Sequence, residues 1–460
     1  MSSPVVINPA AVRAYDIRGT FGRELGLDDA RNLGLAYAAR ARAHDRHRIA
    51  VGRDGRTSSP ALEDALISGL MDGGMHVHRI GLGPTPQLYY SCHTFAFDGG
   101  VMVTGSHNPP GENGFKLLFG GHPVFGAELQ SLVRSECAPA RGGRLFTLRT
   151  AARYVERLAA AAEDIEPFRV VWDCGSGAVG AVIGELTALL SGTHVLLNAQ
   201  VDGSFPMHHP DPAVAANLRQ LQRAVREHRA DLGIAFDGDG DRIGIVDETG
   251  EIVWPDQLLL LLAQDVLARN RNAPIVADVK SSRVLFDGIR QAGGRPVMAP
   301  SGYVLVRRAM LREQAPLAGE MSGHIMFSDA WYGSDDALYA AIRTLAALSR
   351  RSESLGTFRR RLPPSACTPE LRIACPDDRK RIVVEEVAAR VTSSGLSVDT
   401  TDGIRVSTPE GWWLLRASGT EPRLTVRCEA ADPQGLEHLR LQLARELERS
   451  GVDTSLLGTR

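Results

Sequence analysis

Residues 48–55, RIAVGRDG, begin the pattern that decides the fold of this chain. An apolar run leads into a polar turn, and a helical stretch follows until the glycine pair Gly73-Gly74 and a second predicted strand at 77–82. The same order begins again at residue 169 with RVVWDCGSG and at residue 274 with PIVADVKS. A strand, a polar turn, a helix, a glycine stop and a second strand form a βαβ unit, which makes the two strands parallel. The sequence therefore predicts three similar α/β domains in series, with mixed, mainly parallel sheets covered by helices.

The C-terminal part of the chain follows a different pattern. Residues 362–365, LPPS, are typical of a linker. The elements predicted beyond it are a strand at 371–374, a helix at 379–391, strands near 398, at 412–415 and at 424–428, and a final helix at 433–449. Strands and helices without the repeated unit are typical of an α+β domain. The predicted domains are therefore 1–149, 150–251, 252–363 and 364–460.

The composition excludes several classes of protein. Of the 460 residues, 43% are hydrophobic and the mean hydropathy is −0.11, as expected of a chain with sizeable cores. The net charge of −2 gives no electrostatic reason to expect a nucleic acid or an anionic membrane as partner. Six scattered cysteines and an N-terminus without a signal-peptide pattern predict a reducing, cytoplasmic location. The leucine run 258–262 is too short to span a bilayer and is predicted to lie in a buried helix.

Residues 104–110, TGSHNPP, display one hydroxyl nucleophile in a turn. The apolar run 101–103 before it is predicted as a buried strand, Gly105 gives the backbone freedom, and the Asn-Pro pair ends the run. Ser106 is therefore predicted to lie at a strand end, with Lys116 ten positions further on. A serine among polar neighbours is usually only a turn former, so this motif gains its meaning from three polar loops downstream.

Residues 237–242, DGDGDR, form the second polar loop, between two apolar runs. Asp237, Asp239 and Asp241 alternate with glycine, so they can converge on one hard cation, and without a cation they would repel one another. The acids also match positions 1, 3 and 5 of a calcium-binding EF-hand loop. Arg242 stands where that loop needs glycine, however, and strands rather than helices flank the motif. Three carboxylates with room for a phosphate oxygen favour Mg²⁺, and Arg242 is placed to contact the same phosphate.

The third and fourth loops offer groups that bind sugars and anions. Residues 319–324, GEMSGH, place Glu320 and Ser322 on one side of an extended segment, where they can hold vicinal sugar hydroxyls, and His324 can act as an acid or base. Residues 416–423, RASGTEPR, combine arginine, two hydroxyls and glycine, which is typical of an anion-binding nest. The order of a nucleotide P-loop is absent, so ATP is not implied.

Taken in order, these motifs resemble the α-D-phosphohexomutase family, and within it the bacterial phosphomannomutase/phosphoglucomutase group. The resemblance covers nearly the whole chain. It rests on RAYDIRG at 13–19, GRDGR at 52–56, TGSHNPP at 104–110, NGFK at 113–116, HHPDP at 208–212, DGDGDR at 237–242, GEMSGH at 319–324 and RASGTEP at 416–422. It implies four domains around a central active-site cleft, each contributing one loop.

The resemblance also implies a role for each loop. Ser106 would carry a phosphoryl group and complete an Mg²⁺ site made by Asp237, Asp239 and Asp241. Lys116 and His324 would be the acid/base pair. Further roles would be the following: Arg18, Tyr15 and Arg242 orient the substrate and the transferring phosphate, Glu320 and Ser322 hold the sugar, and Arg416, Ser418, Gly419 and Thr420 bind the non-reacting phosphate.

The implied reaction moves a phosphate between C1 and C6 of mannose or glucose. Phosphorylated Ser106 would form a glucose 1,6-bisphosphate or mannose 1,6-bisphosphate intermediate, which also serves as activator, and then take back the other phosphate. Positioning and charge neutralisation supply most of such catalysis. Because one hydroxyl clamp must read both orientations of the sugar, C2 would be loosely read, and dual specificity is the resulting hypothesis. The expected partners are small hexose phosphates, and the chain is expected to be a monomer or weak oligomer.

Several positions depart from the group's pattern. Gly302-Tyr303 stands where members active on glucose and mannose tend to have Gly-His, which leaves the substrate preference open. Gly419 stands where asparagine is frequent, so backbone donors remain and one side chain is lost. Met321 favours the hexose-phosphate group over the glucosamine-phosphate group, and Lys280 matches a basic position that contacts substrate.

Three alternatives stay open at this point. The first is a phosphoglucosamine mutase. The second is a serine- and metal-dependent sugar-phosphate phosphatase, although such an enzyme would not need a separate phosphate nest and sugar clamp. The third is a binding protein without activity, which would be expected to lose Ser106 or one of the aspartates.

Overall fold

The structure is a computed structural model of the chain. It describes residues 3–4, 7–134, 136–137, 139–162, 164–419 and 422–458. The chain divides into two compact units. Unit 1 contains Met1–Asp265 and Pro316–Arg359, and unit 2 contains Val266–Ala315 and Arg360–Arg460. The four domain boundaries predicted from the sequence stay predictions, and the two units are described separately below.

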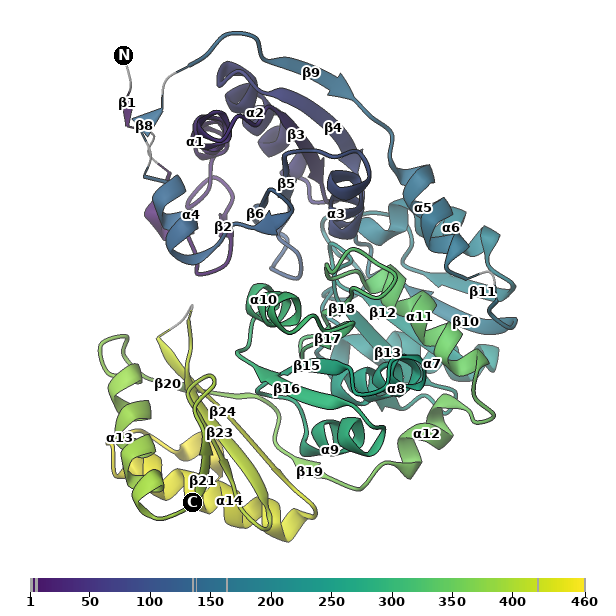
Figure 1. The fold of residues 1–460 in the computed structure, drawn as a ribbon, viewed down its shortest axis with the longest axis vertical. Helices are drawn as coiled ribbons and strands as arrows, with labels where there is room; N and C mark the ends of the chain where they lie inside the picture. The colour runs from purple at the N-terminus through teal and green to yellow at the C-terminus, as the bar shows by residue number, and fades with distance from the viewer. Residues whose placement is uncertain are drawn as a thin grey trace. The chain divides into compact units, whose positions relative to one another are not determined.

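The N-terminal sheet of unit 1 has the strand order β2-β6-β5-β3-β4-β9 (Figure 1). Its strands are β2 (Ile17–Thr20), β3 (Arg48–Arg53), β4 (His76–Leu82), β5 (Gly99–Val103), β6 (Glu112–Phe119) and β9 (Arg144–Thr147), and the short β7 (His122–Pro123) pairs with β6. The pairs β3/β4, β3/β5 and β4/β9 are parallel, whereas β2 and β5 pair with β6 in antiparallel fashion. The short strands β1 (Ser3–Pro4) and β8 (Glu136–Cys137) pair with each other. The predicted mixed sheet is confirmed.

Helices cover both faces of this sheet because side chains alternate along each strand. Ile49 and Val51 pack with α1 (Leu27–Ala43) and α2 (Ser59–Asp72) in one hydrophobic cluster, which also includes α4 (Gly126–Leu132). Ala50, between them, belongs to a second cluster that includes α3 (Thr85–Thr94). The C-terminal end of β5 therefore emerges from a sheet buried on both sides.

The second sheet of unit 1 has the order β11-β10-β12-β13-β14. Its strands are β10 (Phe168–Asp173), β11 (Gly192–Leu197), β12 (Leu232–Phe236), β13 (Ile243–Asp247) and β14 (Ile252–Val253). Strand β10 is parallel to β11 and β12, and β12 and β13 form an antiparallel hairpin. The helices of this region are α5 (Ala151–Ala160), α6 (Ile183–Leu189) and α7 (Arg219–His228). All five residues of β12 and of β13 are buried, so the hairpin turn between them is fixed at both ends.

The third βαβ repeat lies in unit 2. Strands β15 (Pro274–Asp278) and β16 (Arg295–Ala299) are parallel, as predicted, and α9 (Arg283–Gln291) and α10 (Tyr303–Glu313) accompany them. Strands β17 (Leu317–Gly319) and β18 (Ile325–Phe327) form a hairpin in unit 1, followed by α11 (Ala337–Ser349) and α12 (Leu355–Arg361). The leucine run lies buried in α8 (Pro255–Arg269), also as predicted. None of the helices in the described part of the chain combines the length and apolar character needed to cross a membrane.

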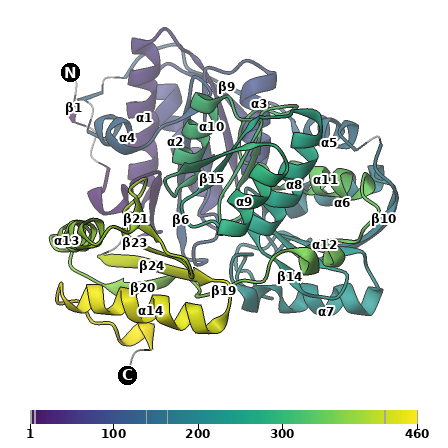
Figure 2. The same ribbon diagram turned by 60° about the horizontal axis from the view of Figure 1, so that its bottom comes forward.

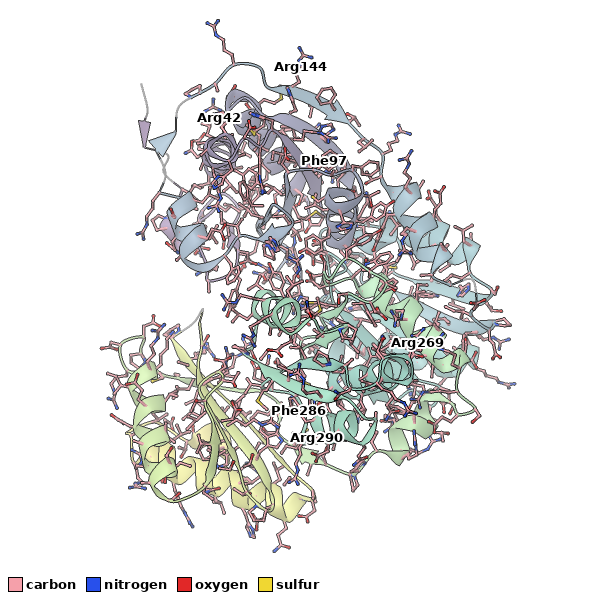
Figure 3. All side chains as sticks on the ribbon, viewed as in Figure 1. Arg42, Phe97, Arg144, Arg269, Phe286 and Arg290 are labelled. Atoms are coloured by element: carbon pink, nitrogen blue, oxygen red, sulfur yellow. The ribbon has the colours of Figure 1, made fainter. Side chains whose placement is uncertain are left out.

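The C-terminal part of unit 2 is an α+β domain. Strands β19 (Ala366–Cys367), β24 (Arg423–Ala430), β23 (Gly411–Ala417), β22 (Ile404–Ser407) and β21 (Ser397–Asp399) follow one another across the sheet, and β20 (Leu371–Ala374) also pairs with β24. Helices α13 (Lys380–Ser393) and α14 (Pro433–Glu448) pack on one face, and Figure 2 shows α14 running alongside β24. On the opposite face, Trp412 and Leu414 pack against Val279. Side chains fill both units, as Figure 3 shows.

Candidate active site

Ser106 lies just beyond the end of β5, as predicted. Its φ of +48° is in the left-handed region, which is rare for a residue with a side chain and is typical of functional turns. The side chain is buried, and its Oγ donates a hydrogen bond to Asp237 Oδ2 at 2.6 Å. His107 Nδ1 lies 3.2 Å from the same oxygen. The nucleophile predicted from the sequence therefore meets the first carboxylate of the acidic loop.

Two arginines hold the serine loop in this shape. The Arg56 guanidinium is fully buried, and it donates to the carbonyl oxygens of Ser106, Asn108, Pro109 and Glu112 at 2.5 to 2.8 Å. Arg18 Nη1 donates to Gly105 O at 3.0 Å and to Asn108 Oδ1 at 2.6 Å. A Cβ atom at Gly105 would lie 2.5 Å from Arg56 Nε, so the loop requires glycine there.

The three aspartates occupy the turn between β12 and β13 and are completely buried. One carboxylate oxygen from each of Asp237, Asp239 and Asp241 lies within 4.8 Å of the others. Gly238 allows this turn to approach the serine loop, because a Cβ atom there would lie 2.3 Å from Ser106 O. The alternating glycines of the motif thus serve close backbone approach as well as turn formation.

The charges of this cluster fit a bound cation. Burial, together with the neighbouring carboxylates of Asp241 and Asp239, raises the pKa of Asp237 well above its ordinary value. Asp239 Oδ2 accepts hydrogen bonds from Thr85 Oγ1 at 2.6 Å and from Lys116 Nζ at 2.7 Å, whereas its Oδ1 is buried without a hydrogen-bond partner. Buried carboxylate oxygens that lack a partner are the donors that a hard divalent cation uses.

Lys116 and His324 contact different oxygens of the Asp241 carboxylate. Lys116, on β6, is buried and donates to Asp241 Oδ2 as well as to Asp239. His324 Nε2 lies 3.2 Å from Asp241 Oδ1. Burial alone would lower the pKa of His324, but the Asp241 carboxylate outweighs this effect and raises it to about 10. The imidazole is therefore protonated at neutral pH and can donate a proton or stabilise negative charge.

The loop between β17 and β18 carries the residues predicted to hold the sugar. Glu320 Oε1 accepts a hydrogen bond from Ser322 Oγ and lies 3.0 Å from His324 Nδ1. Arg242 forms an antiparallel β-bridge with His324, and its Nε lies 3.4 Å from His324 Nε2. The structure thus brings together Ser106, Arg18, Lys116, the three aspartates, Arg242 and this loop within unit 1. Tyr15 lies in the turn before β2, with its ring 6.3 Å from that of Phe125.

The remaining predicted residues belong to unit 2. Lys280 Nζ lies 3.3 Å from Glu370 and 3.8 Å from Asp278. Arg416 Nε lies 2.9 Å from Asp402 Oδ2, which also accepts a hydrogen bond from Ser301 N at 3.0 Å.

Asp402 therefore links Arg416, which is predicted to bind an anion, to the loop that precedes Tyr303, the first residue of α10. Ser418 N donates to Arg423 O at 2.9 Å. A Cβ atom at Gly419 would meet no neighbour within 4 Å. Thr420 is outside the described residues.

Sequence reasoning missed three residues of the site. Arg56 was noted only as part of a family motif, and its buried position behind the serine loop gave no local signal. His107 belongs to the TGSHNPP motif but was given no role, yet burial, with Arg242 and Arg18 close by, lowers its pKa well below the ordinary value. Asp335 Oδ2 lies 3.8 Å from His324 Nε2. The acidic pair Asp335-Asp336 before α11 was the available signal for it.

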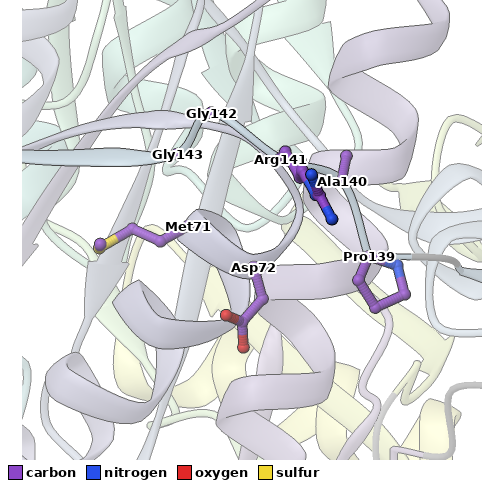
Figure 4. Close-up of a pocket in the computed structure, with 7 residues that line it drawn as sticks. All are labelled: Met71, Asp72, Pro139, Ala140, Arg141, Gly142 and Gly143. Atoms are coloured by element: carbon purple, nitrogen blue, oxygen red, sulfur yellow. The ribbon is translucent and has the colours of Figure 1, made fainter.

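A surface pocket of unit 1 lies apart from these residues. Figure 4 shows it between the C-terminal end of α2 and the segment 139–143. Its lining residues are Met71, Asp72, Pro139, Ala140, Arg141, Gly142 and Gly143. It contains no residue predicted to act in the site, so the acidic cluster rather than this pocket is the candidate active site.

Comparison with known proteins assigns the chain to a family. Models of the phosphoglucomutase/phosphomannomutase family match in order: alpha/beta/alpha domains I, II and III at residues 10–135, 152–250 and 254–365, and the C-terminal domain at 370–446. A phosphomannomutase/phosphoglucomutase of Pseudomonas syringae pv. tomato is 40% identical, over 99% of this chain and 100% of that protein. A phosphoglucomutase of Neisseria meningitidis serogroup A is also 40% identical, over 95% of this chain and 96% of that protein.

A solved structure agrees with this assignment. The crystal structure of a phosphoglucomutase/phosphomannomutase family protein from Burkholderia thailandensis has 37% sequence identity and a TM-score of 0.90. The match covers 97% of this chain and 98% of that one. The sequence motifs, the acidic cluster beside Ser106 and these full-length matches lead to one conclusion: the chain belongs to the phosphoglucomutase/phosphomannomutase family of α-D-phosphohexomutases.

Proposed function

We propose that this protein is a phosphomannomutase/phosphoglucomutase, which interconverts the 1-phosphate and 6-phosphate of mannose or glucose. The observation that carries the proposal is the 2.6 Å hydrogen bond from Ser106 Oγ to Asp237, because it joins a strained, buried nucleophile to a cluster of three carboxylates. Phosphoryl transfer needs this combination of nucleophile, cation site and surrounding positive charge.

The reaction proceeds through two phosphoryl transfers. The free hydroxyl of the sugar phosphate attacks the phosphorus of phospho-Ser106, so a new sugar O–P bond forms and the Oγ–P bond breaks. The hydroxyl proton passes to a base, the departing Ser106 Oγ takes up a proton from an acid, and the product is a hexose 1,6-bisphosphate. After this intermediate reverses its orientation, the Ser106 hydroxyl loses its proton to a base and its Oγ attacks the other phosphate, so that an Oγ–P bond forms, the sugar O–P bond breaks, and the departing sugar oxygen takes up a proton. The serine phosphate is thereby regenerated.

The buried charges supply the acid, the base and the electrostatic stabilisation. Asp237, Asp239 and Asp241 would hold Mg²⁺, with phospho-Ser106 as a further ligand, and the ion when bound supplies charge neutralisation at the transferring phosphate. Lys116 and His324 are the proposed acid/base pair. Arg242 and Arg18 orient the phosphoryl group and offset its charge.

Substrate recognition is shared by several loops. Glu320 and Ser322 hold sugar hydroxyls, and Lys280 and Tyr303 also contact the substrate. The non-reacting phosphate binds Arg416, Ser418, Gly419 and Thr420. A clamp that reads hydroxyls common to both orientations is indifferent to C2, which supports activity on both glucose and mannose. Met321 favours these sugars over glucosamine. The enzyme would act on soluble hexose phosphates in the cytoplasm as a monomer or weak oligomer, a state that sedimentation velocity tests.

A phosphorus NMR time course tests the proposal. Mannose 1-phosphate and glucose 1-phosphate are offered separately, with Mg²⁺ and a trace of glucose 1,6-bisphosphate. Growth of the 6-phosphate resonance with both sugars is the expected result. Release of inorganic phosphate alone would replace the mutase by a phosphatase. If neither sugar phosphate were converted but glucosamine 1-phosphate were, the substrate would be a glucosamine phosphate instead.

A further inference from the structure

The loop that carries Lys280 is anchored from the C-terminal sheet by a buried arginine. This loop, residues 279–282, connects β15 to α9 within unit 2. Arg405, on β22, donates from one nitrogen, Nη1, to Val279 O at 2.7 Å and to Ser281 O at 2.8 Å. These two carbonyl groups lie immediately before and after Lys280, so one guanidinium fixes the backbone on both sides of that residue.

Packing holds the Arg405 guanidinium itself in place. Its Cζ lies 3.7 Å from the centre of a Trp412 ring and 5.4 Å from that of Phe286, which Figure 3 labels on α9. The residue is 5% exposed, and burial lowers its pKa to about 10, so the group keeps its charge at neutral pH. Charge-assisted hydrogen bonds from a planar group stacked on an aromatic ring are strong and directional.

A second buried charge anchors the other end of the loop. Glu429 Oε1, on β24, accepts hydrogen bonds from Ser282 Oγ at 2.9 Å, Arg283 N at 3.0 Å and Trp412 Nε1 at 3.1 Å. Glu429 is 4% exposed. Its carboxylate therefore fixes the start of α9 and, through Trp412, the ring on which Arg405 stacks.

Burying these charged groups costs desolvation free energy, which packing of the two surfaces against each other would not require. Apolar side chains of similar volume usually hold two surfaces together as well as buried ionic groups do, and they avoid the desolvation of charge. Here the two buried charges bond to Val279, Ser281 and Ser282 of the loop and to Arg283 at the start of α9. Groups in a binding site must be held to within a fraction of an ångström to be effective, and supporting hydrogen bonds provide that precision.

We propose that Arg405 and Glu429 are positioning residues, which fix the Lys280 loop so that the Lys280 ammonium meets the substrate at one defined place. This inference rests on the proposed function, which gives Lys280 a contact with the substrate. Neither Arg405 nor Glu429 is expected to touch the substrate. Their effect should pass through Lys280, and this distinguishes positioning from a contribution to general stability.

A double-mutant cycle tests the proposal in the full-length enzyme. The proteins are the wild type, Lys280→Met, Arg405→Met and the double variant, each assayed for KM and kcat with glucose 1-phosphate. We expect Lys280→Met to raise KM by about tenfold, as the loss of one charged contact would. Arg405→Met should raise KM by a similar factor with a smaller change in kcat. The KM of the double variant should exceed that of Lys280→Met by no more than about twofold, because the effects of coupled residues are not additive.

Further variants secure the interpretation. Arg283→Ala is the matched control, since that side chain is 60% exposed and pairs only with Asp287 of the same helix among the ion pairs described, so its KM should stay within about twofold of the wild type. If Arg405→Met fails to fold, Arg405→Lys and Glu429→Gln, which retain a donor and an acceptor, replace it in the same cycle.

The outcomes distinguish a failure of the proposed mutase function from a failure of the positioning role of Arg405. Wild-type enzyme that does not isomerise glucose 1-phosphate or mannose 1-phosphate would overturn the proposed function. Isomerisation with an unchanged KM in Lys280→Met would remove the role of Lys280 and with it the positioning role. A raised KM in Lys280→Met, with multiplicative effects in the double variant, would leave the function standing and overturn the inference about Arg405. Non-additive effects on KM would support it.

Discussion

Replacing Arg56 by lysine should loosen the serine loop. The wild-type guanidinium is fully buried, lies 3.3 Å from Asp54 and donates to four carbonyl oxygens of residues 106–112. A lysine ammonium keeps the charge opposite Asp54, but it is a compact donor on a flexible stem and cannot reproduce the planar fork. At least two of the four carbonyl groups would therefore lose their partner while remaining buried.

The size of the effect follows from this count. Two carbonyls left unsatisfied at about 1.5 kcal/mol each give a loss of about 3 kcal/mol of stability. For a domain of about 150 to 250 residues, a loss of about 3 kcal/mol lowers Tm by about 6 to 12 °C. The bond from Arg56 to Ser106 O also helps to hold Ser106 at a φ of +48°. Its loss should release the nucleophile from its strained position and lower kcat by about tenfold or more, equivalent to about 1.4 kcal/mol of barrier.

Calorimetry at one fixed scan rate and the steady-state conversion of glucose 1-phosphate measure the two effects. Arg53→Lys is the matched control, because Arg53 ends β3 three residues before Arg56, is 25% exposed, and has its Nε 3.5 Å from Glu63. This control should melt within about 2 °C of the wild type. If Arg56→Lys had the same Tm as the control and kept the wild-type kcat, the bonds from Arg56 to the four carbonyl oxygens would not be what holds the serine loop.

Three further predictions concern the nucleophile, the metal and pH. Ser106→Ala should lower kcat by at least about 10³-fold while calorimetric binding of glucose 1-phosphate changes little, and near-normal turnover would exclude Ser106 as the nucleophile. Mg²⁺ at 100 times its Kd should stabilise the wild type by about 2.7 kcal/mol in thermal unfolding and leave Asp239→Asn much less affected; equal stabilisation would place the ion elsewhere. Burial raises the pKa of Glu63 from 4.5 to about 6, so the folded protein binds a proton at this residue more tightly than the unfolded chain does. The resulting contribution to stability is fully present below pH 4.5 and is lost as the pH rises through 6. The stability of Glu63→Gln relative to wild type should therefore increase by about 2 kcal/mol between pH 4.5 and 7, whereas a constant difference in Tm would contradict this.

The strands and their polar ends were predictable because their signals are local. The apolar runs before residues 52, 173 and 278 are each followed by a polar turn, and the structure ends β3, β10 and β15 at Arg53, Asp173 and Asp278. The strand β22, at Ile404–Ser407, was missed. Its four residues, IRVS, alternate apolar and polar side chains as strands do, but the segment is short, and pairing with β21 and β23 supplies the stability that it lacks alone.

Taken by itself, the sequence determined which chemical groups are displayed in turns, since glycine spacing and hydrophobic periodicity depend only on neighbours along the chain. It also determined the family, because the motifs occur together in one order. Only the tertiary structure decided which of these groups meet. Ser106 bonds to Asp237 across 131 positions, and Lys116 to Asp239 across 123. The roles of Arg56 and Arg405 likewise arise from burial against loops distant in sequence. Such contacts depend on how sheets and domains pack, and no local pattern encodes a partner at that separation.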